Sequence, residues 1–294
     1  MKLSTRIIAT VALAGTAMAF TSCKREQDAN ATVININGSD TMLQVGLGWQ
    51  AEYMKQHPEV QVAVNGEGSG VGIKALINGE ITVAHSSRSI KESEIAQIKE
   101  KYGKEPVEHI LGFDGIAVFC HKDNPVKEIT MEQLQSIYAA GGEITKWEQI
   151  NPAQTGDIKV AGRSNTSGTH VYFKEAVCGK TADGTGREFK KGILSMPGSA
   201  AVVDLCMTDK TAIGYSGMGY VSDKVGVISV SKGAGETAYE PTVENVQSKN
   251  YPIARRLYAY TVGEPEGATK AYLDWVKGPE GQAIVAKEKF VPLQ

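Results

Sequence analysis

Short apolar runs alternate along the chain with longer segments that are apolar on one side only. The runs have the length of strands, are rich in Val, Ile, Ala and aromatic residues, and occur at 33–36, 60–64, 81–84, 115–119, 158–161 and 257–261. The segments between them have helical spacing and lie at 42–57, 68–77, 89–102, 130–141, 169–177, 200–207 and 268–276. Strands that alternate with helices predict an α/β fold with parallel sheets.

Local signals mark some of the expected helix ends. Ser89 with Glu92, and Thr130 with Gln133, have the three-residue spacing of a capping box, which predicts helices that begin there. Residues 179–192 are rich in Gly and Lys and lack either period, so we expect an exposed loop.

Four of the predicted strands end in clusters of small polar residues that open the next helix. The clusters are Gly38-Ser39-Asp40-Thr41, Gly68-Ser69-Gly70, Ser86-Ser87-Arg88 and 163–169, which reads Arg-Ser-Asn-Thr-Ser-Gly-Thr. The first turn of a helix has free N–H groups and a partial positive charge, and hydroxyls and Arg add donors. Ligands of open α/β sheets bind beyond the carboxyl ends of the strands. The clusters therefore predict a site for a compact oxyanion.

The first residues form a separate unit. Lys2 and Arg6 precede an apolar run at 7–20 that is too short to span a bilayer, which is typical of an export signal. The sequence Thr21-Ser22-Cys23 then resembles a lipoprotein cleavage site, although Phe20 departs from its usual Leu. We expect a signal peptide at 1–22, lipidation of Cys23 and a polar tether at 23–31. An ordinary secretory signal that is cut nearby is the alternative.

Composition limits the possible functions of the remaining chain. It is long enough for two lobes. The net charge of −2 argues against a broad basic surface for nucleic acid. Cys120, Cys178 and Cys206 allow at most one internal disulfide, and we favour three buried thiols instead.

Catalytic and cofactor motifs are absent from the sequence. The His and Cys residues show no metal-ligand spacing, and no nucleotide-binding glycine motif occurs. Ser167 and His170 lie three residues apart, but side chains on one short turn seldom form a catalytic pair, and the Gly-x-Ser-x-Gly elbow is absent. We therefore expect a binding protein without cofactor or metal, and a phosphoester hydrolase is a remote alternative.

A set of short motifs in a fixed order identifies a resemblance over nearly the whole chain after the export signal. They are Gly38-Ser39-Asp40-Thr41, Gly66-Glu67-Gly68-Ser69-Gly70, Ser86-Ser87-Arg88, Asp114-Gly115-Ile116-Ala117-Val118, Ile144-Thr145-Lys146-Trp147, Ser167-Gly168-Thr169, Ile213-Gly214-Tyr215 and Tyr251-Pro252-Ile253. The chain resembles the phosphate-binding proteins of bacterial ABC importers. The resemblance implies a two-lobed periplasmic-binding-protein fold (type II-like), with two crossings between the lobes and the ligand in the cleft. We place lobe 1 at 32–117 plus 223–294 and lobe 2 at 118–222.

The resemblance also implies which residues bind phosphate. The first lobe would contribute Thr41, Ser69 and the backbone N–H of Met42. The second lobe would contribute Arg163, Ser167, the N–H of Gly168, and Thr169.

The third cluster departs from the family pattern. Well-studied members have an Asp that accepts the proton of HPO4²⁻, where this chain has Ser87 followed by Arg88. A buried phosphate O–H without an acceptor costs about 1–3 kcal/mol. Asp114 is one candidate acceptor, and pairing with Arg88 is its equally weighted alternative. Asp40 is a weaker candidate, because it suits a helix cap. Arg88 is either a direct ligand or an orienting residue.

These expectations combine into one function. A monomeric protein, exported and lipid-anchored to the cell envelope, would capture inorganic phosphate by closure of its cleft and deliver it to an ABC permease. Without the usual Asp, a receptor for tungstate, molybdate or sulfate stays open, since these anions carry no proton. A signalling or scavenging protein without a transporter partner is a further alternative.

Overall fold

The structure, a computed structural model, describes residues 32–293. The predictions for the signal peptide (1–22), the lipidation of Cys23 and the tether (23–31) lie outside these residues. Among the described helices, none combines the length and the apolar character that a membrane crossing requires.

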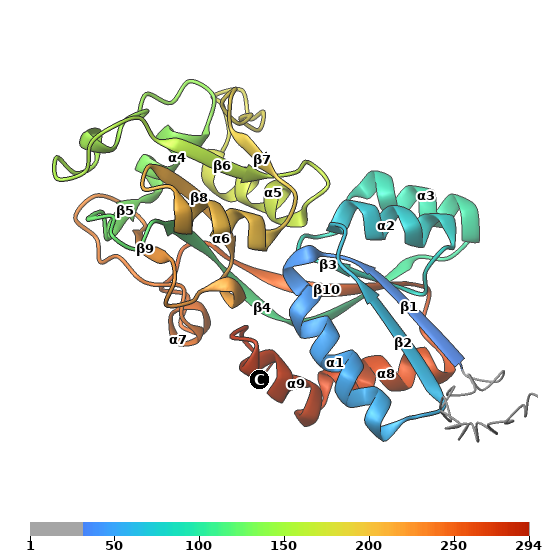
Figure 1. The fold of residues 1–294 in the computed structure, drawn as a ribbon. Coiled ribbons are helices and arrows are strands. Elements are labelled where there is room, and N and C mark those ends of the chain that lie inside the picture. The colour runs from blue at the N-terminus through green and yellow to red at the C-terminus, as the bar shows by residue number, and fades with distance from the viewer. Residues whose placement is uncertain (1–31, 294) are drawn as a thin grey trace, which may run out of the picture.

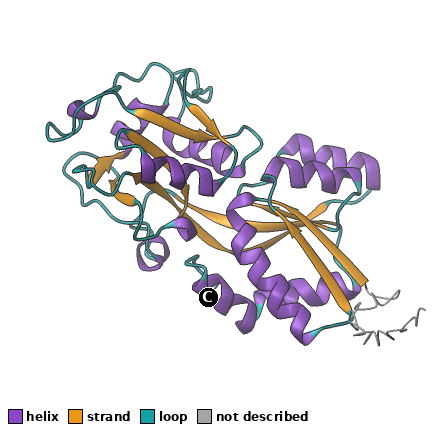
Figure 2. Ribbon diagram, in the orientation of Figure 1, coloured by secondary structure: helices purple, strands orange, loops and turns teal. Residues whose placement is uncertain are grey.

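The described strands form one continuous, mixed sheet that runs through two lobes (Figures 1 and 2). The order is β2-β1-β3-β10-β4-β8-β6-β7, and β9 pairs with β4 and β5. The bounds are β1 Thr32–Gly38, β2 Val60–Asn65, β3 Val83–Ser86, β4 Pro106–Cys120, β5 Glu128–Thr130, β6 Lys159–Arg163, β7 Leu194–Met196, β8 Ala212–Gly217, β9 Gly226–Ser231 and β10 Ala254–Val262.

Helices pack around the sheet in both lobes (Figure 2). In chain order they are α1 Leu43–Gln56, α2 Ser69–Asn78, α3 Glu92–Tyr102, α4 Met131–Tyr138, α5 Gly168–Phe173, α6 Ser199–Thr208, α7 Val243–Gln247, α8 Gly267–Lys277 and α9 Pro279–Lys287. In the first lobe Trp49 and Tyr53 of α1 are buried, and Tyr53 meets Tyr272 of α8 edge-on. In the second lobe Phe173 stacks on Tyr215, with ring centroids 3.6 Å apart.

Two strands connect the lobes, as expected from the resemblance. β4 leads from the first lobe to the second and β10 begins the return, so the two run side by side in opposite directions (Figure 1). This arrangement corrects the expectation of purely parallel sheets. β1, β2 and β3 are parallel, but β10 is antiparallel to both β3 and β4, and β4 is antiparallel to β8 and β9. A strand that returns directly from the other lobe arrives in the reverse direction.

The strand pairing suggests different lobe boundaries. β9 pairs with β5 and with the C-terminal half of β4, so it belongs with the second lobe. The chain that returns to the first lobe passes beside Ile116, whose N–H donates to the Ile253 carbonyl over 2.8 Å. We therefore propose that lobe 1 comprises 32–114 plus 254–293 and lobe 2 comprises 115–253, in place of the predicted boundaries at 118 and 223.

Most of the predicted elements are confirmed, but some ends differ. Thr130 and Gln133 form the expected capping box. The other predicted box is wrong: α3 begins at Glu92 after Lys91, since the Glu94 carboxylate accepts the Lys91 N–H. The sequence prediction missed the short elements β5, β7, β9 and α7, the helix α9 and the first part of β4.

Cys120, Cys178 and Cys206 are free and buried, which confirms the favoured interpretation of these residues. Burial raises the pKa of the Cys120 and Cys178 thiols to about 12 and also raises that of Cys206. All three thiols are therefore protonated at neutral pH.

Candidate anion-binding site

The first three polar clusters lie at one edge of the sheet, as predicted. β1, β2 and β3 are parallel, so the residues after each strand meet at their common carboxyl end. Here Thr41 and Ser69 are buried, and the Ser69 hydroxyl accepts the N–H of Ser87 over 3.1 Å. The Met42 N–H, which the resemblance placed among the phosphate donors, donates instead to the Ser39 carbonyl over 3.0 Å, within the turn that precedes α1.

The second lobe contributes Arg163 at the end of β6 and the first turn of α5. Ser167 is the N-cap of α5, and its hydroxyl oxygen accepts the N–H groups of Thr169 and His170. Its own O–H remains available as a donor. The N–H of Gly168, in the first turn of the helix, has no partner within the helix. This turn therefore presents several donors toward the other lobe.

The clusters of the two lobes touch one another in this structure. The hydroxyls of Thr41 and Thr169 lie 2.7 Å apart, and the Gly70 N–H donates to the Thr166 carbonyl over 2.9 Å. Gly168 lies so close to the first lobe that a Cβ there would be 2.2 Å from the Ser69 Oγ. The structure is therefore a closed form, and the close approach requires glycine at 168.

An ion pair also joins the two lobes at this edge. Asp40 Oδ2 accepts from Arg163 Nη2 over 2.8 Å, and from the N–H and hydroxyl of Ser199 over 2.8 and 2.7 Å. Arg163 donates further to Ser199 and more distantly to Ser216. Asp40 does not cap the first helix: Ser39 is the N-cap of a 3-10 turn at Asp40–Met42, and Met42 is the N-cap of α1, so the predicted capping role is wrong.

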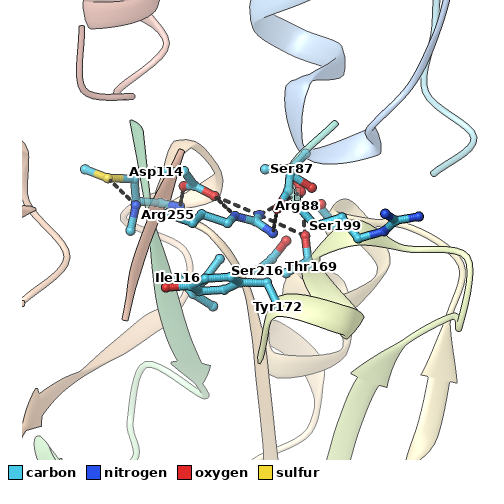
Figure 3. A network of polar contacts seen from close by, with 12 residues as sticks. Ser87, Arg88, Asp114, Ile116, Thr169, Tyr172, Ser199, Ser216 and Arg255 are labelled. Atoms are coloured by element: carbon cyan, nitrogen blue, oxygen red, sulfur yellow. Dashed lines mark hydrogen bonds and ion pairs between the residues drawn. The ribbon is translucent and has the colours of Figure 1, made fainter. Parts of the chain in front are cut away.

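Arg255 lies at the centre of the cluster, and the sequence prediction missed it (Figure 3). It comes from β10 and pairs with Asp114 of β4, with Nε and Nη2 at 3.0 and 2.8 Å from Oδ2. Its Nη2 also donates to the hydroxyls of Thr169 and Thr41, over 2.9 and 3.3 Å. Its Nη1 donates to the Ser87 carbonyl over 2.8 Å. One guanidinium on the connecting strands thus contacts both lobes.

The Asp114–Arg255 pair is fully enclosed. Burial raises the pKa of the Asp114 carboxyl, and the adjacent Arg255 together with the Met218 N–H acts against this rise. Burial also lowers the pKa of Arg255, and the Asp114 charge acts against that. The Tyr172 ring lies 5.6 Å from the guanidinium carbon and covers it. Charges buried this deeply require each other as partners.

Arg88 pairs with Glu94 and not with Asp114. Its guanidinium forms two bonds to the Glu94 carboxylate, over 2.9 and 2.7 Å, and a third to the Ser89 carbonyl. The pairing of Arg88 with Asp114 is therefore wrong, because Glu94 takes Arg88 and Arg255 takes Asp114. The structure favours Arg88 as an orienting residue, since its backbone carbonyl and N–H hold the Ser86 hydroxyl in the third cluster.

Three buried donors of the polar clusters have no hydrogen-bond partner within residues 32–293: Ser39 Oγ, Arg88 Nε and Arg163 Nε. Unpaired buried donors are rare in folded proteins and point to a ligand or water that completes them. A metal does not suit this site, because guanidinium groups already pair with both of its carboxylates, Asp40 and Asp114. In the part of the chain that the structure describes, no group of three His, Cys, Asp or Glu side chains has a metal-binding arrangement.

Comparison with known proteins gives the family. The PBP superfamily domain matches residues 24–280. The phosphate-binding protein PstS of Pseudomonas aeruginosa is 31% identical over 271 residues, which are 87% of this chain and 81% of that protein. The chain belongs to the PstS family. The PstS of Bacillus subtilis is 28% identical and covers 92% of this chain, with 84% of its own length matched.

Solved structures of similar proteins agree with the fold. A Clostridium perfringens protein, described as a phosphate ABC transporter substrate-binding protein with bound phosphate, superimposes with a TM-score of 0.77 at 30% identity. It covers 90% of this chain, and all of that chain is matched. A phosphate transport receptor of Vibrio cholerae gives a TM-score of 0.68 at 26% identity, over 89% of this chain and 100% of its own. The predicted two-lobed binding-protein fold is thus confirmed.

Proposed function

We propose that this protein captures inorganic phosphate outside the cytoplasm for an ABC phosphate importer. The observation that carries the proposal is the convergence of hydroxyl and guanidinium donors from both lobes in a chain of the PstS family. The protein is a binding protein and not an enzyme. Its task is to hold the anion and release it unchanged.

Closure of the lobes provides the mechanism. In the closed form the Thr41 and Thr169 hydroxyls bond to each other across the interface. A phosphate inserted between the lobes would replace this bond, because each hydroxyl would then donate to an oxygen of the phosphate. Only a form with both lobes close together makes both sets of contacts, so the anion stabilises closure.

We propose a ligand set of donors from each lobe and from the connecting strand. Thr41, Ser69 and Ser87 would bind from the first lobe, and Arg163, Ser167, Thr169 and the Gly168 N–H from the second. Arg163 Nε supports this assignment because it is buried and has no partner among the described residues. We add Arg255, whose Nη2 already contacts the hydroxyls of Thr41 and Thr169. Charge-assisted bonds of this kind are strong in a buried site.

Asp114 is our proposed acceptor for the proton of HPO4²⁻. Its Oδ2 is occupied by Arg255, but Oδ1 receives only the Met218 N–H over 3.0 Å and retains accepting capacity. Asp40 fits this role less well, because its side chain is partly exposed, at 18%, whereas that of Asp114 is fully buried.

Delivery requires partners that we assign as part of the proposal. The closed, loaded protein would dock on the membrane subunits of the importer. Lipidation at Cys23 and the tether at 23–31 would keep it near the membrane on the outer side. The protein would act as a monomer, since one chain contributes all the donors named above.

Calorimetric titration with phosphate, arsenate, sulfate and tungstate tests the function. We expect tight binding of phosphate and arsenate and much weaker binding of the two fully ionised anions. Arg163→Ala should remove tight phosphate binding and leave the folded state intact, and Arg187→Ala, in the exposed 179–192 loop, serves as a matched control. Tungstate binding that is tighter than phosphate binding would instead assign the protein to another oxyanion.

A further inference from the structure

A cavity of about 1320 Å³ lies beside the strands that connect the lobes, next to the phosphate-binding cluster. The register of β10 on β4 shows which residues of the connecting strands face the cavity. Arg255 pairs with Asp114 in the β10–β4 ladder, and the next pair is Arg256 with Phe113. Because successive side chains of a strand point to opposite faces, Arg256 and Phe113 lie on the reverse face from the Asp114–Arg255 pair. Arg256 and Phe113 both line the cavity.

The cavity adjoins the phosphate site and shares Arg255 with it, but most of its lining is different. Its lining includes neither Thr41, Ser69 and Arg163 nor the first turn of α5. Arg88 and Arg255 form part of its wall, but their guanidinium groups are bonded to Glu94 and Asp114. Other cationic side chains would therefore have to bind an anion in this cavity.

Three such cations are present. Lys232, Lys249 and Arg256 line the cavity, are exposed, and form no ion pair within residues 32–293. No Asp or Glu of the described chain lines it. Lys249 is also one of two described non-glycine residues with a positive φ, at 60°, and its N–H donates to the Val246 carbonyl. Like charges without a counter-charge repel each other, so an anion would relieve the repulsion.

The rest of the lining is largely apolar. Met131, Tyr172 and Val246 come from the second lobe, whereas Phe113, Val291 and Leu293 come from the first. Pockets for small molecules usually combine such surfaces with a few placed polar groups, and this one exceeds the common range of about 300–1,000 Å³. It accommodates a molecule with an apolar body.

We propose that this cavity binds an amphipathic organic anion. The anionic head would contact Arg256, Lys249 and Lys232, and the apolar body would lie between Met131 and Val246 on one side and Phe113 and Leu293 on the other. Because these walls belong to both lobes and to the connecting strands, the bound anion contacts both lobes at once. The proposal does not depend on phosphate being the ligand of the other site.

Binding is tested with three ten-carbon probes of different charge, each below its micellar concentration. Isothermal titration should detect decanoate but neither decanol nor decyltrimethylammonium at the same concentration. Arg256→Gln should weaken decanoate binding at least about fivefold, the scale of a lost charge-assisted bond. Lys224→Gln, an exposed cation outside the cavity lining, is the matched control and should change nothing.

A second variant tests the cavity rather than its charge. Ala254 lies two residues before Arg256, on the same face of β10, and Ala254→Leu would narrow the cavity beside Arg256 while it keeps all the cations. It should weaken decanoate binding, and circular dichroism with thermal unfolding of each variant reports whether the protein is folded. Equal binding of the three probes, or unchanged decanoate binding in both variants, overturns the proposal. Dimerisation in sedimentation that Arg256→Gln removes would assign the surface to a second copy, and would overturn it too.

Discussion

Asp40 and Arg163 form an ion pair across the two lobes, with Oδ2 and Nη2 2.8 Å apart. The same carboxylate oxygen also accepts the N–H and hydroxyl of Ser199 at the start of α6. Three donors of the second lobe therefore depend on one carboxylate of the first. This arrangement holds the lobes closed by contacts that are independent of the threonine hydroxyls.

Replacing Asp40 should shift the protein toward an open form. Asp40→Asn removes the charge that Arg163 and Ser199 share, so the ligand-free closed form should lose about 1–3 kcal/mol, as expected for hydrogen bonds to a charged group. Small-angle scattering should then give a larger radius of gyration without phosphate, and phosphate should restore the compact value. Asp223→Asn, an exposed residue without an ion pair, is the control. Identical scattering of all three proteins would contradict this role of Asp40.

Adding one methyl group at Gly168 should block closure. The new Cβ would lie 2.2 Å from the Ser69 Oγ and 2.7 Å from the Ser87 Oγ, so the lobes must stop short of their closed positions. Overpacking of this kind costs about 1–3 kcal/mol, which corresponds to a roughly 5- to 150-fold loss of phosphate affinity. Calorimetry measures the loss for Gly168→Ala. Gly186→Ala is the matched control, because no atom lies within 4 Å of its added Cβ.

Asp114→Asn separates two roles of the carboxylate. If Asp114 accepts the phosphate proton, the variant should lose affinity for phosphate and gain affinity for sulfate, which narrows the preference by at least about tenfold, or 1.4 kcal/mol. If Asp114 only holds Arg255 in place, the affinities for both anions should fall together. Arg255→Lys supplies the comparison, because a lysine cannot reproduce the forked contacts to Asp114, Ser87 and Thr169. Unchanged affinities for both anions in Asp114→Asn would exclude it from the site.

His85 should make the protein less stable at acidic pH. Burial lowers its pKa from the usual 6.5 to about 4, so the folded state keeps it neutral. As the pH falls from 6.5 to 4, the unfolded state takes up a proton that the folded state does not, and the free energy of unfolding decreases by about 3 kcal/mol. Above pH 6.5 His85 is neutral in both the folded and the unfolded state, so no stability is lost through it.

Urea unfolding at several pH values between 4 and 7 measures this effect. His85→Gln should give a flatter dependence than the natural protein. Burial also lowers the pKa of His109, but that residue is present in both proteins and cancels in the comparison. Parallel pH profiles would show that another group causes the acid sensitivity.

Sequence patterns predicted the parts of the fold whose signals are local. β1, β2 and β3 show apolar runs, and the polar cluster after each follows directly in the chain. The first part of β4 was missed because Pro106, Glu108 and His109 interrupt its apolar pattern. Its strand conformation depends on pairing with β10, more than 130 residues later in the chain. Pairing with a strand so far away in the chain does not require an apolar pattern in the first part of β4.

The centre of the site was missed for a similar reason. Arg255 is a charged residue at the start of an apolar strand, and nothing around it in the sequence separates it from the exposed Arg256. What distinguishes the two is the face of the strand on which each lies, together with Asp114, which is 141 positions away. For Arg88, the family pattern suggested a role near the anion, but Glu94, only six residues on, holds its guanidinium.

The three buried thiols have a practical consequence. Because Cys120, Cys178 and Cys206 are enclosed and protonated at neutral pH, maleimide reagents should ignore them in the folded protein. A soluble version that begins after Cys23 could therefore carry one engineered surface cysteine and a fluorophore at the rim of the cleft, without removal of any native cysteine. Closure of the lobes would change the surroundings of the dye, and the protein would become an optical reporter of its own ligand.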